Sequence, residues 1–224
     1  MSSPRWLRLL TDNLGVNKAP AYTLATVEQN NPQPIPRSRT LIHRQVLTIT
    51  PPKSLLITTT DIRTPKASQL IINSTSEATF WFPESEIQFR ITAQTYLLPN
   101  PNHQWISSFP FDLLSGNKVF DWEKFRLDAY DSLSPYLRAS FVRPVPGTPM
   151  KSYDEANSWP QTLSTRDEAK GEDEKNVAVA LENFAIVVLD PTKVDLVELA
   201  VHPNRRTEWT LTTGNVWLEQ ILVP

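Results

Sequence analysis

Basic side chains and hydroxyl groups gather in two short segments that could together hold a phosphate group. Residues 37–44 read RSRTLIHR, and residues 58–66 read TTTDIRTPK. An arginine guanidinium gives a phosphate two parallel charge-assisted hydrogen bonds, and a lysine adds a compact point charge. The chain has only five glycines. The phosphate would therefore be held by side chains and a helix end, because the glycine-rich loops of common nucleotide sites are missing.

The second segment predicts a helix that runs from Pro65 to about Ile72. Thr64 is a favoured N-cap residue, and proline fits the first helical position because it has no N–H to leave unpaired. Lys66 lies in the first turn, where the helix dipole disfavours a positive charge. A lysine in this position indicates an anion nearby. The alternative is a solvated lysine at an exposed helix start.

The first segment predicts a strand over residues 35–43. Arg37 and Arg39 share one face of this strand, whereas Arg44 falls on the opposite face unless the strand ends or bulges near His43. Arg39 and Arg44 can reach one ligand only if the chain bends at His43. The alternative leaves Arg44 on a solvated face.

The remaining pattern predicts a mainly β protein with flanking helices, as an antiparallel sheet or barrel. Apolar patterns place Trp6, Trp81 and Trp122 in the core. Polar, charged residues at 144–175 predict a mobile loop inserted in a single domain of residues 1–224. Strands are expected at 22–28, 35–43, 55–60, 77–82, 86–98, 183–189, 193–200, 207–212 and 216–223, and helices near 3–15, at 65–72 and over 121–141, the last divided by Pro135.

Composition excludes several classes of function. The net charge is −2 and the pI is near 6, so a broad basic field for nucleic acid or membrane surfaces is not expected. The chain has no cysteine and three scattered histidines, which predicts no metal site and no catalytic thiol. No apolar run approaches the roughly twenty residues of a membrane span. We expect a soluble cytoplasmic protein.

Several segments, taken in order, resemble the pyridoxamine 5′-phosphate oxidase family. These are RTLIHR at 39–44, the hydroxyl-rich strand that leads to Lys66, FWF at 80–82 before EIQFR at 86–90, and PNRR at 203–206. The resemblance is nearest to the branch called the Alr4036-type FMN-binding domain, which also carries a segment like LRASF at 137–141. It covers roughly residues 6–224, with 152–175 unmatched.

The resemblance implies an FMN-binding split β-barrel that forms a homodimer, with FMN bound at the subunit interface. It also implies roles for particular residues. Lys66 would carry the main phosphate charge, Gln88 would lie near the flavin and be supplied across the dimer, and either Arg205 or Arg206 would contact the cofactor. The full set of implied cofactor-binding residues is Arg39, Thr40, Leu41, Ile42, Arg44, Thr59, Thr60, Lys66, Gln88, Arg205 and Arg206.

Two departures from the family pattern bear on function. Pro65 stands where the family has a basic residue, so phosphate contacts are either fewer or moved to Arg63. The segment His202-Pro203-Asn204 stands where the family's substrate-binding Arg-x-His element is expected. The vitamin B6 site of the family is therefore incomplete in this chain. Taken with these departures, the resemblance implies an FMN-dependent oxidoreductase of unknown substrate and unassigned catalytic residues. The alternatives are a flavin-binding carrier or sensor module with little turnover, and a barrel that binds protein or nucleic acid without flavin.

Overall fold

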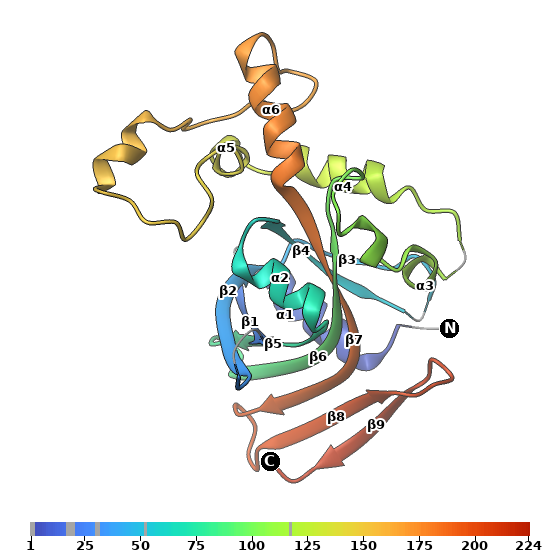
Figure 1. The fold of residues 1–224 in the computed structure, drawn as a ribbon. Coiled ribbons are helices and arrows are strands. Elements are labelled where there is room, and N and C mark those ends of the chain that lie inside the picture. The colour runs from blue at the N-terminus through green and yellow to red at the C-terminus, as the bar shows by residue number, and fades with distance from the viewer. Residues whose placement is uncertain (1–2, 17–20, 30–31, 52, 117) are drawn as a thin grey trace.

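The computed structural model describes residues 3–16, 21–29, 32–51, 53–116 and 118–224. Strands dominate the first half and the C-terminal end, and most helices lie between them (Figure 1). The elements are α1 (Arg5–Val16), β1 (Ala21–Glu28), β2 (Ile35–Ile42), β3 (Gln45–Leu47), β4 (Leu55–Asp61), α2 (Pro65–Ile72), β5 (Thr75–Phe82), β6 (Ile87–Leu98), η1 (Ile106–Ser108), α3 (Phe111–Ser115), α4 (Trp122–Asp131), α5 (Pro135–Ser140), η2 (Tyr153–Ser158), α6 (Glu172–Asn183), β7 (Phe184–Glu198), β8 (Arg205–Leu211) and β9 (Trp217–Leu222).

The nine strands of the described residues belong to one antiparallel sheet in the order β2-β1-β5-β6-β7-β4-β3, and β8 and β9 extend it from the other part of β7. The sheet curves without closing. Beyond Ile57, β4 has β7 as its only strand partner in the part of the chain that the structure describes. The predicted mainly β class with flanking helices is confirmed, in the form of an open, split barrel.

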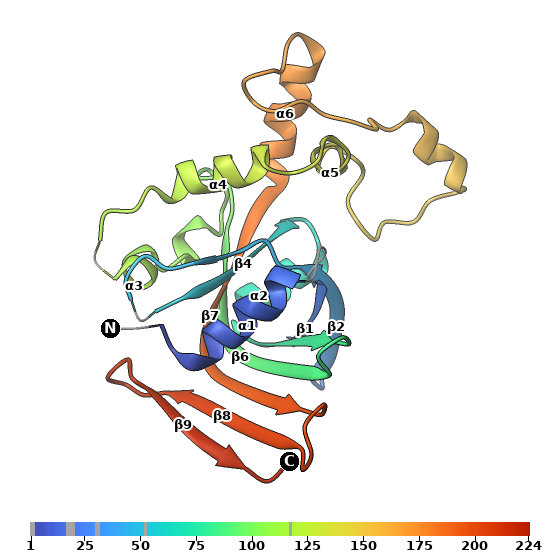
Figure 2. The same cartoon turned by 180° about the vertical axis from the view of Figure 1, so that it is seen from behind.

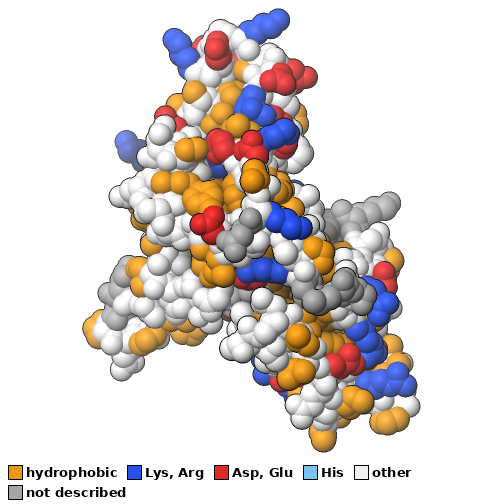
Figure 3. Space-filling model, turned by 90° about the vertical axis from the view of Figure 1, so that its right-hand side faces the viewer, with side chains coloured by type: hydrophobic (Ala, Val, Ile, Leu, Met, Phe, Trp, Pro, Cys, Tyr) orange, Lys and Arg blue, Asp and Glu red, His pale blue; other side chains and the backbone are white. Residues whose placement is uncertain are grey.

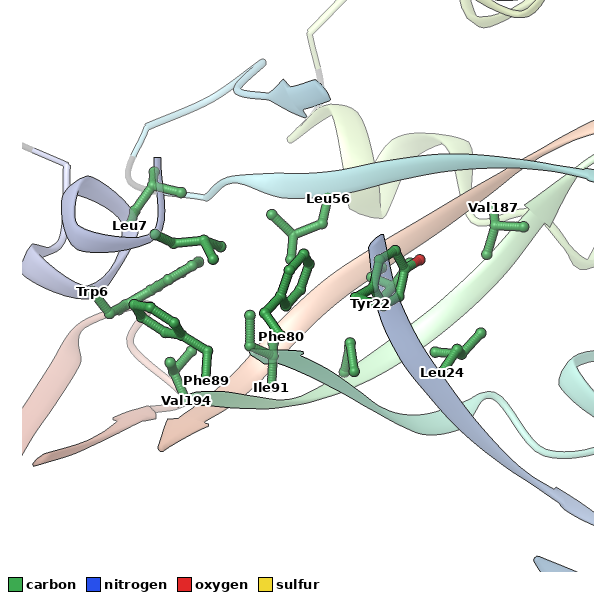
Figure 4. Close-up of a cluster of buried hydrophobic side chains, with 14 of the residues drawn as sticks. Trp6, Leu7, Tyr22, Leu24, Leu56, Phe80, Phe89, Ile91, Val187 and Val194 are labelled. Carbon is green, nitrogen blue, oxygen red and sulfur yellow. The ribbon is translucent and has the colours of Figure 1, made fainter. Parts of the chain in front are cut away.

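The barrel interior is filled by one face of each strand. In β5, Ala78, Phe80 and Phe82 are buried and alternate with half-buried or exposed residues, as the two-residue period of a strand requires. Figure 4 shows Phe80 with Phe89 of β6, and Trp6 of α1 closing this end of the core. Burying each large side chain contributes about 1.5–3 kcal/mol, so this core fixes the strands that carry the site.

A second core lies on the other face of β4 and β7, under helices α4, α5 and α6. Residues 184–190 of β7 are all buried, because barrel and helices cover the two faces. The sequence predicted two strands here, and one strand of 15 residues is found instead. Pro191, which lies between the two predicted strands, is level with Ala93 of β6 and next to a register shift between Thr92 and Ala93. A bulge at this point accommodates proline, which has no N–H to donate to the sheet.

The segment 144–171 reaches away from the sheet between α5 and α6 (Figure 2). The part of this segment near Leu163 is held against the helices by Arg138, which is 5% exposed. Arg138 donates to the carbonyl of Leu163 (2.9 Å) and to the carbonyls of Asp131 and Leu133. The loop predicted at 144–175 ends earlier in the structure, because residues 172–175 belong to α6, and it contains a short 3-10 helix at 153–158. The acidic first turn of α6 suits a helix N-terminus.

The surface shows no concentration of one charge on the face in Figure 3, where Lys and Arg side chains are interspersed with Asp and Glu. Among the described residues, no helix is both long enough and apolar enough to cross a membrane.

Candidate functional site

The start of α2 is built as the sequence predicted, with Pro65 as its first residue and Ile72 as its last. Thr64 has the extended backbone of an N-cap, but its hydroxyl donates to the carbonyl of Asp61 (2.7 Å) and leaves the helix N-terminus without a side-chain cap. The ammonium group of Lys66 donates to the hydroxyls of Thr60 (2.8 Å) and Thr64 (3.0 Å). Two predicted residues, Thr60 and Lys66, are thus brought into contact.

Lys66 is a desolvated cation. Its pKa is lowered to about 8, first by burial and then by the charge of Arg39, with Asp61 acting in the opposite direction. The carboxylate of Asp61 is taken up by the guanidinium of Arg63 (2.6 Å). In the described part of the chain, no carboxylate lies within ion-pair distance of Lys66. A cation in this state is stabilised when an anion binds beside it.

Arg39 approaches the same place from β2. Its guanidinium donates to the hydroxyl of Thr26 (2.6 Å) and to the side-chain oxygen of Gln69 (3.0 Å) on α2. Its pKa is lowered by burial and by the neighbouring Arg37. Like Lys66, it has no carboxylate partner among the residues that the structure describes. We call Arg39, Thr60, Thr64 and Lys66 the α2 cation cluster. Thr26 and Gln69 belong to this network and were not predicted from the sequence, whereas Thr64 was predicted as the N-cap of α2.

Arg63 does not contribute a free charge to the cluster. It is bound to Asp61 and also donates to the carbonyls of Phe141 (3.2 Å) and Arg143 (3.1 Å). Of the two alternatives for the missing basic residue at Pro65, the structure therefore favours fewer phosphate contacts over contacts moved to Arg63.

The predicted bend at His43 is present. β2 ends at Ile42, β3 begins at Gln45, and the Arg44 N–H donates to the carbonyl of Ile57 (2.8 Å). His43 itself is 7% exposed, and burial lowers its pKa to about 4, so it is neutral at pH 7. A buried neutral imidazole beside Phe80 (ring centroids 6.1 Å) agrees with a structural role.

Arg44 and Thr59 are not brought to the α2 cation cluster. Thr59 alternates with Thr60 along β4 and therefore faces the other side of the strand. There it lines a groove of about 580 Å³ together with Arg44 and residues of α4. On β2, Leu41 packs against the barrel core, whereas Thr40 and Ile42 lie on the exposed side. Of the predicted residues, Thr60 thus lies on the side of β4 that carries Lys66, whereas Arg44 and Thr59 lie on the opposite side.

Gln88, Arg205 and Arg206 lie elsewhere on the sheet. Gln88 is level with Val197 of β7, which is level with Arg206 of β8, so Gln88 and Arg206 share one face. Arg205 is opposite Glu198 and faces the other way. Arg206 donates to Asp195 (2.8 Å), whose carboxylate also accepts from Arg90 (2.6 Å). Glu208 of β8, which is level with Asp195, adds a second carboxylate to this face.

Trp81 was expected in the core and is 45% exposed instead. It is the register partner of Gln88 and shares that residue's outward face, because Phe80 and Phe82 take the inward positions of β5. The outer face near Gln88 therefore offers an aromatic side chain beside the polar groups.

A metal centre has no support in the described residues, where no group of three or more His, Asp or Glu side chains could hold an ion. The α2 cation cluster fits a phosphate instead. It offers two cations without carboxylate partners and an uncapped helix N-terminus, which is the donor set that a phosphate monoester requires.

Comparisons with known proteins give the family of the N-terminal part of the chain and the fold. Residues 3–99 match the model of the pyridoxamine 5′-phosphate oxidase FMN-binding domain. No curated protein matches the chain. A pyridoxamine 5′-phosphate oxidase-related, FMN-binding protein from Nostoc punctiforme PCC 73102 has a similar structure (TM-score 0.73, 24% identity, 100% of both chains covered). PhzG from Burkholderia lata 383, solved with tetrahydrophenazine-1-carboxylic acid, is also similar (TM-score 0.64, 15% identity, 98% of this chain and 89% of that chain covered).

The two structural likenesses show the fold, and the family model gives the cofactor of the matched domain as FMN. The Alr4036-type branch stays a prediction. Residues 3–99, which carry α1, α2 and strands β1 to β6, are thereby identified as the FMN-binding domain of the pyridoxamine 5′-phosphate oxidase family.

Proposed function

We propose that the protein is a homodimeric FMN-dependent oxidoreductase that holds the FMN phosphate in the α2 cation cluster. One observation carries the proposal. Lys66 and Arg39 are partly buried, the charge of Arg39 lowers the pKa of Lys66, and neither cation has a carboxylate partner among the described residues. The free energy spent on this arrangement is recovered when a phosphate dianion binds between them.

The remaining residues of β2 and β4 take the other end of the cofactor. The edge of β4 at residues 58–61 is open to a ligand, since β3 pairs only with residues 55–57. A ligand anchored at Lys66 and lying across this edge meets the backbone of β2 at 40–42 and then Arg44 and Thr59. When bound, FMN supplies hydride transfer at its ring, and the chain supplies orientation and charge. No catalytic side chain is assigned.

The positions of the predicted residues on two faces of the sheet support the proposed homodimer. Arg39 is level with Leu24, whose partner Ala78 is level with the buried Ile91, so Arg39 points to the barrel side. Gln88 alternates with the buried Phe89 and points outward. One chain cannot present both sets to a single FMN. A second copy that docks its outward face against the open edge of β4 would add Gln88 and Arg206 to the site.

Binding of FMN and riboflavin to the purified protein tests the proposal. We expect a yellow protein with flavin absorption bands, a dimer by light scattering, and riboflavin bound at least about tenfold more weakly than FMN, because riboflavin lacks the charge-assisted contacts. Equal affinity for the two flavins, or a flavin-loaded monomer, would contradict the assignment.

Turnover separates an oxidoreductase from the alternative of a flavin-binding carrier or sensor. Oxidation of pyridoxamine 5′-phosphate is expected to be slow, with kcat/KM below roughly 10⁴ M⁻¹s⁻¹, because the His202-Pro203-Asn204 segment lacks the family's basic substrate element. An efficient rate would show that other residues rebuild the vitamin B6 site. The single domain of residues 1–224, the mobility of the loop and the cytoplasmic location remain predictions from the sequence.

A further inference from the structure

Residues 144–160 stand away from the rest of the molecule, and we call them the 144–160 arm. Figures 1 and 2 show the arm on the side of the molecule where β2 lies, with α3 on the opposite side. The two ends of the arm meet at Arg143, whose Nε donates to the carbonyl of Pro160 (3.2 Å) and whose Cζ lies 4.5 Å from the ring centroid of Tyr136. The arm is therefore a closed loop with a fixed base.

In the described part of the chain, the arm is held at its base alone. The hydrogen bonds of residues 145–159 all join them to residues within 145–161. No residue of the arm is buried, and none belongs to either of the two cores described above.

The arm nevertheless has a defined local structure. The short helix η2 covers residues 153–158. Four prolines restrict the conformations that the loop can adopt, which reduces the entropy lost when the arm is fixed; they are Pro144, Pro146, Pro149 and Pro160. A segment of this length without a core of its own is usually functional.

The arm exposes apolar and aromatic side chains. Tyr153 is 94% exposed, Val145 is 41% exposed and Met150 is 39% exposed. Tyrosine and methionine are enriched in the centres of protein–protein interfaces. Their exposure on one projecting, pre-shaped segment is typical of a surface that packs against another chain.

The base of the arm lies beside the strand edge that the proposed dimer uses. Arg63, which follows the end of β4 at Asp61, donates to the carbonyl of Arg143 (3.1 Å) at the start of the arm. Residues 58–61 of β4 form the open edge at which a second copy would dock. A second copy at this edge is therefore next to the point where the arm leaves the molecule.

We infer that the 144–160 arm packs against the second copy of the chain in the homodimer, with Tyr153 in the contact. This inference rests on the proposed function, which supplies the homodimer. In a two-fold dimer each chain places its own arm on the other, so every dimer contains two such contacts. Residues 152–175 have no match in the family pattern, so this contact is a feature of the chain itself.

Dilution of the FMN-loaded protein tests the inference. The dissociation constant of the dimer is measured by analytical ultracentrifugation for the natural sequence, for Tyr153→Ser, and for a variant in which Gly-Ser-Gly replaces residues 145–158. We expect Tyr153→Ser to weaken the dimer at least about tenfold, because the change acts in both arms. The replacement should weaken it at least about a hundredfold.

Val119→Ser is the matched control. Val119 is 106% exposed and lies in the α3–α4 connection, on the side of the molecule away from the arm (Figure 1). This change also removes an exposed apolar side chain, and it should leave the dissociation constant of the dimer unchanged. Circular dichroism checks that each variant keeps its strands.

The outcomes separate this inference from the proposed function. A natural sequence that is monomeric when loaded with FMN contradicts the homodimer and with it the proposed function. A dimer that Tyr153→Ser does not weaken overturns the role of the arm alone, and so does an equal loss in Val119→Ser. The comparison at Tyr153 decides the matter even if the Gly-Ser-Gly variant does not fold, because a side chain that is 94% exposed is not part of the core.

Discussion

Replacing Lys66 with methionine should weaken FMN binding without destabilising the protein. Methionine has nearly the length of lysine and no charge, so the change removes the ammonium group but little volume. If Lys66 serves the phosphate, the FMN-free protein loses only an unfavourable desolvated charge. If Lys66 is instead a structural donor to Thr60 and Thr64, the same change costs stability. The two roles therefore predict opposite changes in the free energy of unfolding.

The size of both effects follows from the structure. The pKa of Lys66 falls from 10.5 to about 8, and a tenfold change in proton affinity corresponds to about 1.4 kcal/mol. The charge thus costs at most about 3.5 kcal/mol, and partial solvent access reduces this to roughly 1–2 kcal/mol. Loss of a charge-assisted bond to the phosphate costs about 1.5–3 kcal/mol. FMN affinity should fall about tenfold to a hundredfold, while the FMN-free variant is as stable as the natural sequence or more stable.

The pH dependence gives a second readout. Because the folded-state pKa of Lys66 is lowered, the folded protein releases this proton near pH 8, whereas the unfolded chain keeps it until about 10.5. The stability of the FMN-free protein should therefore rise between pH 8 and 10 through this group. FMN affinity should decline over the same range, since the phosphate then meets a neutral amine. Lys66→Met should remove both slopes.

Urea unfolding of the FMN-free proteins and fluorescence titration with FMN measure the two quantities. Lys175→Met is the matched control, because Lys175 lies in the first turn of α6 and is exposed. A variant at Lys66 that loses more than about 1 kcal/mol of stability and keeps its FMN affinity would refute the phosphate role.

Two further changes test other parts of the argument. Arg206→Gln should lower FMN affinity about tenfold in equilibrium dialysis and Arg205→Gln should not, because only Arg206 shares the face of Gln88; equal effects would show that this face does not meet the cofactor. Arg138→Met should lower the free energy of unfolding by about 3 kcal/mol, since it leaves the carbonyl of Leu163 and two others without a donor, and a loss no larger than in Arg8→Met would contradict this.

The local part of the candidate site was predictable because its signals are local. Thr64, Pro65 and Lys66 specify a helix start through N-cap geometry, the fixed backbone of proline and the dipole. The bend at His43 was predicted only on the condition that Arg39 and Arg44 reach one ligand, because the two-residue strand period places them on opposite faces. None of these needed knowledge of distant contacts, and the bounds of α2 agree with the prediction at both ends.

Long-range parts of the network were not predictable. The hydroxyl of Thr26 donates to Gln69, 43 residues away (2.6 Å), and nothing in either local pattern marks these two residues as partners. Trp81 was misplaced because the run FWF was taken as uniformly apolar, whereas strand alternation places only its two phenylalanines inward. The groove at Arg44 depends on α4, which packs there through the second core.

The division of the predicted residues between two faces of one sheet connects cofactor binding to assembly. Arg39 and Lys66 face the barrel side, whereas Gln88 and Arg206 face outward. If both sets hold the same FMN, that FMN contacts two chains, and its binding free energy contains a contribution from the subunit interface. Such coupling is reciprocal. FMN must then stabilise the dimer by as much as dimer formation strengthens FMN binding, so a change at Arg206 would weaken both, whereas a change at Lys66 would act first on the phosphate.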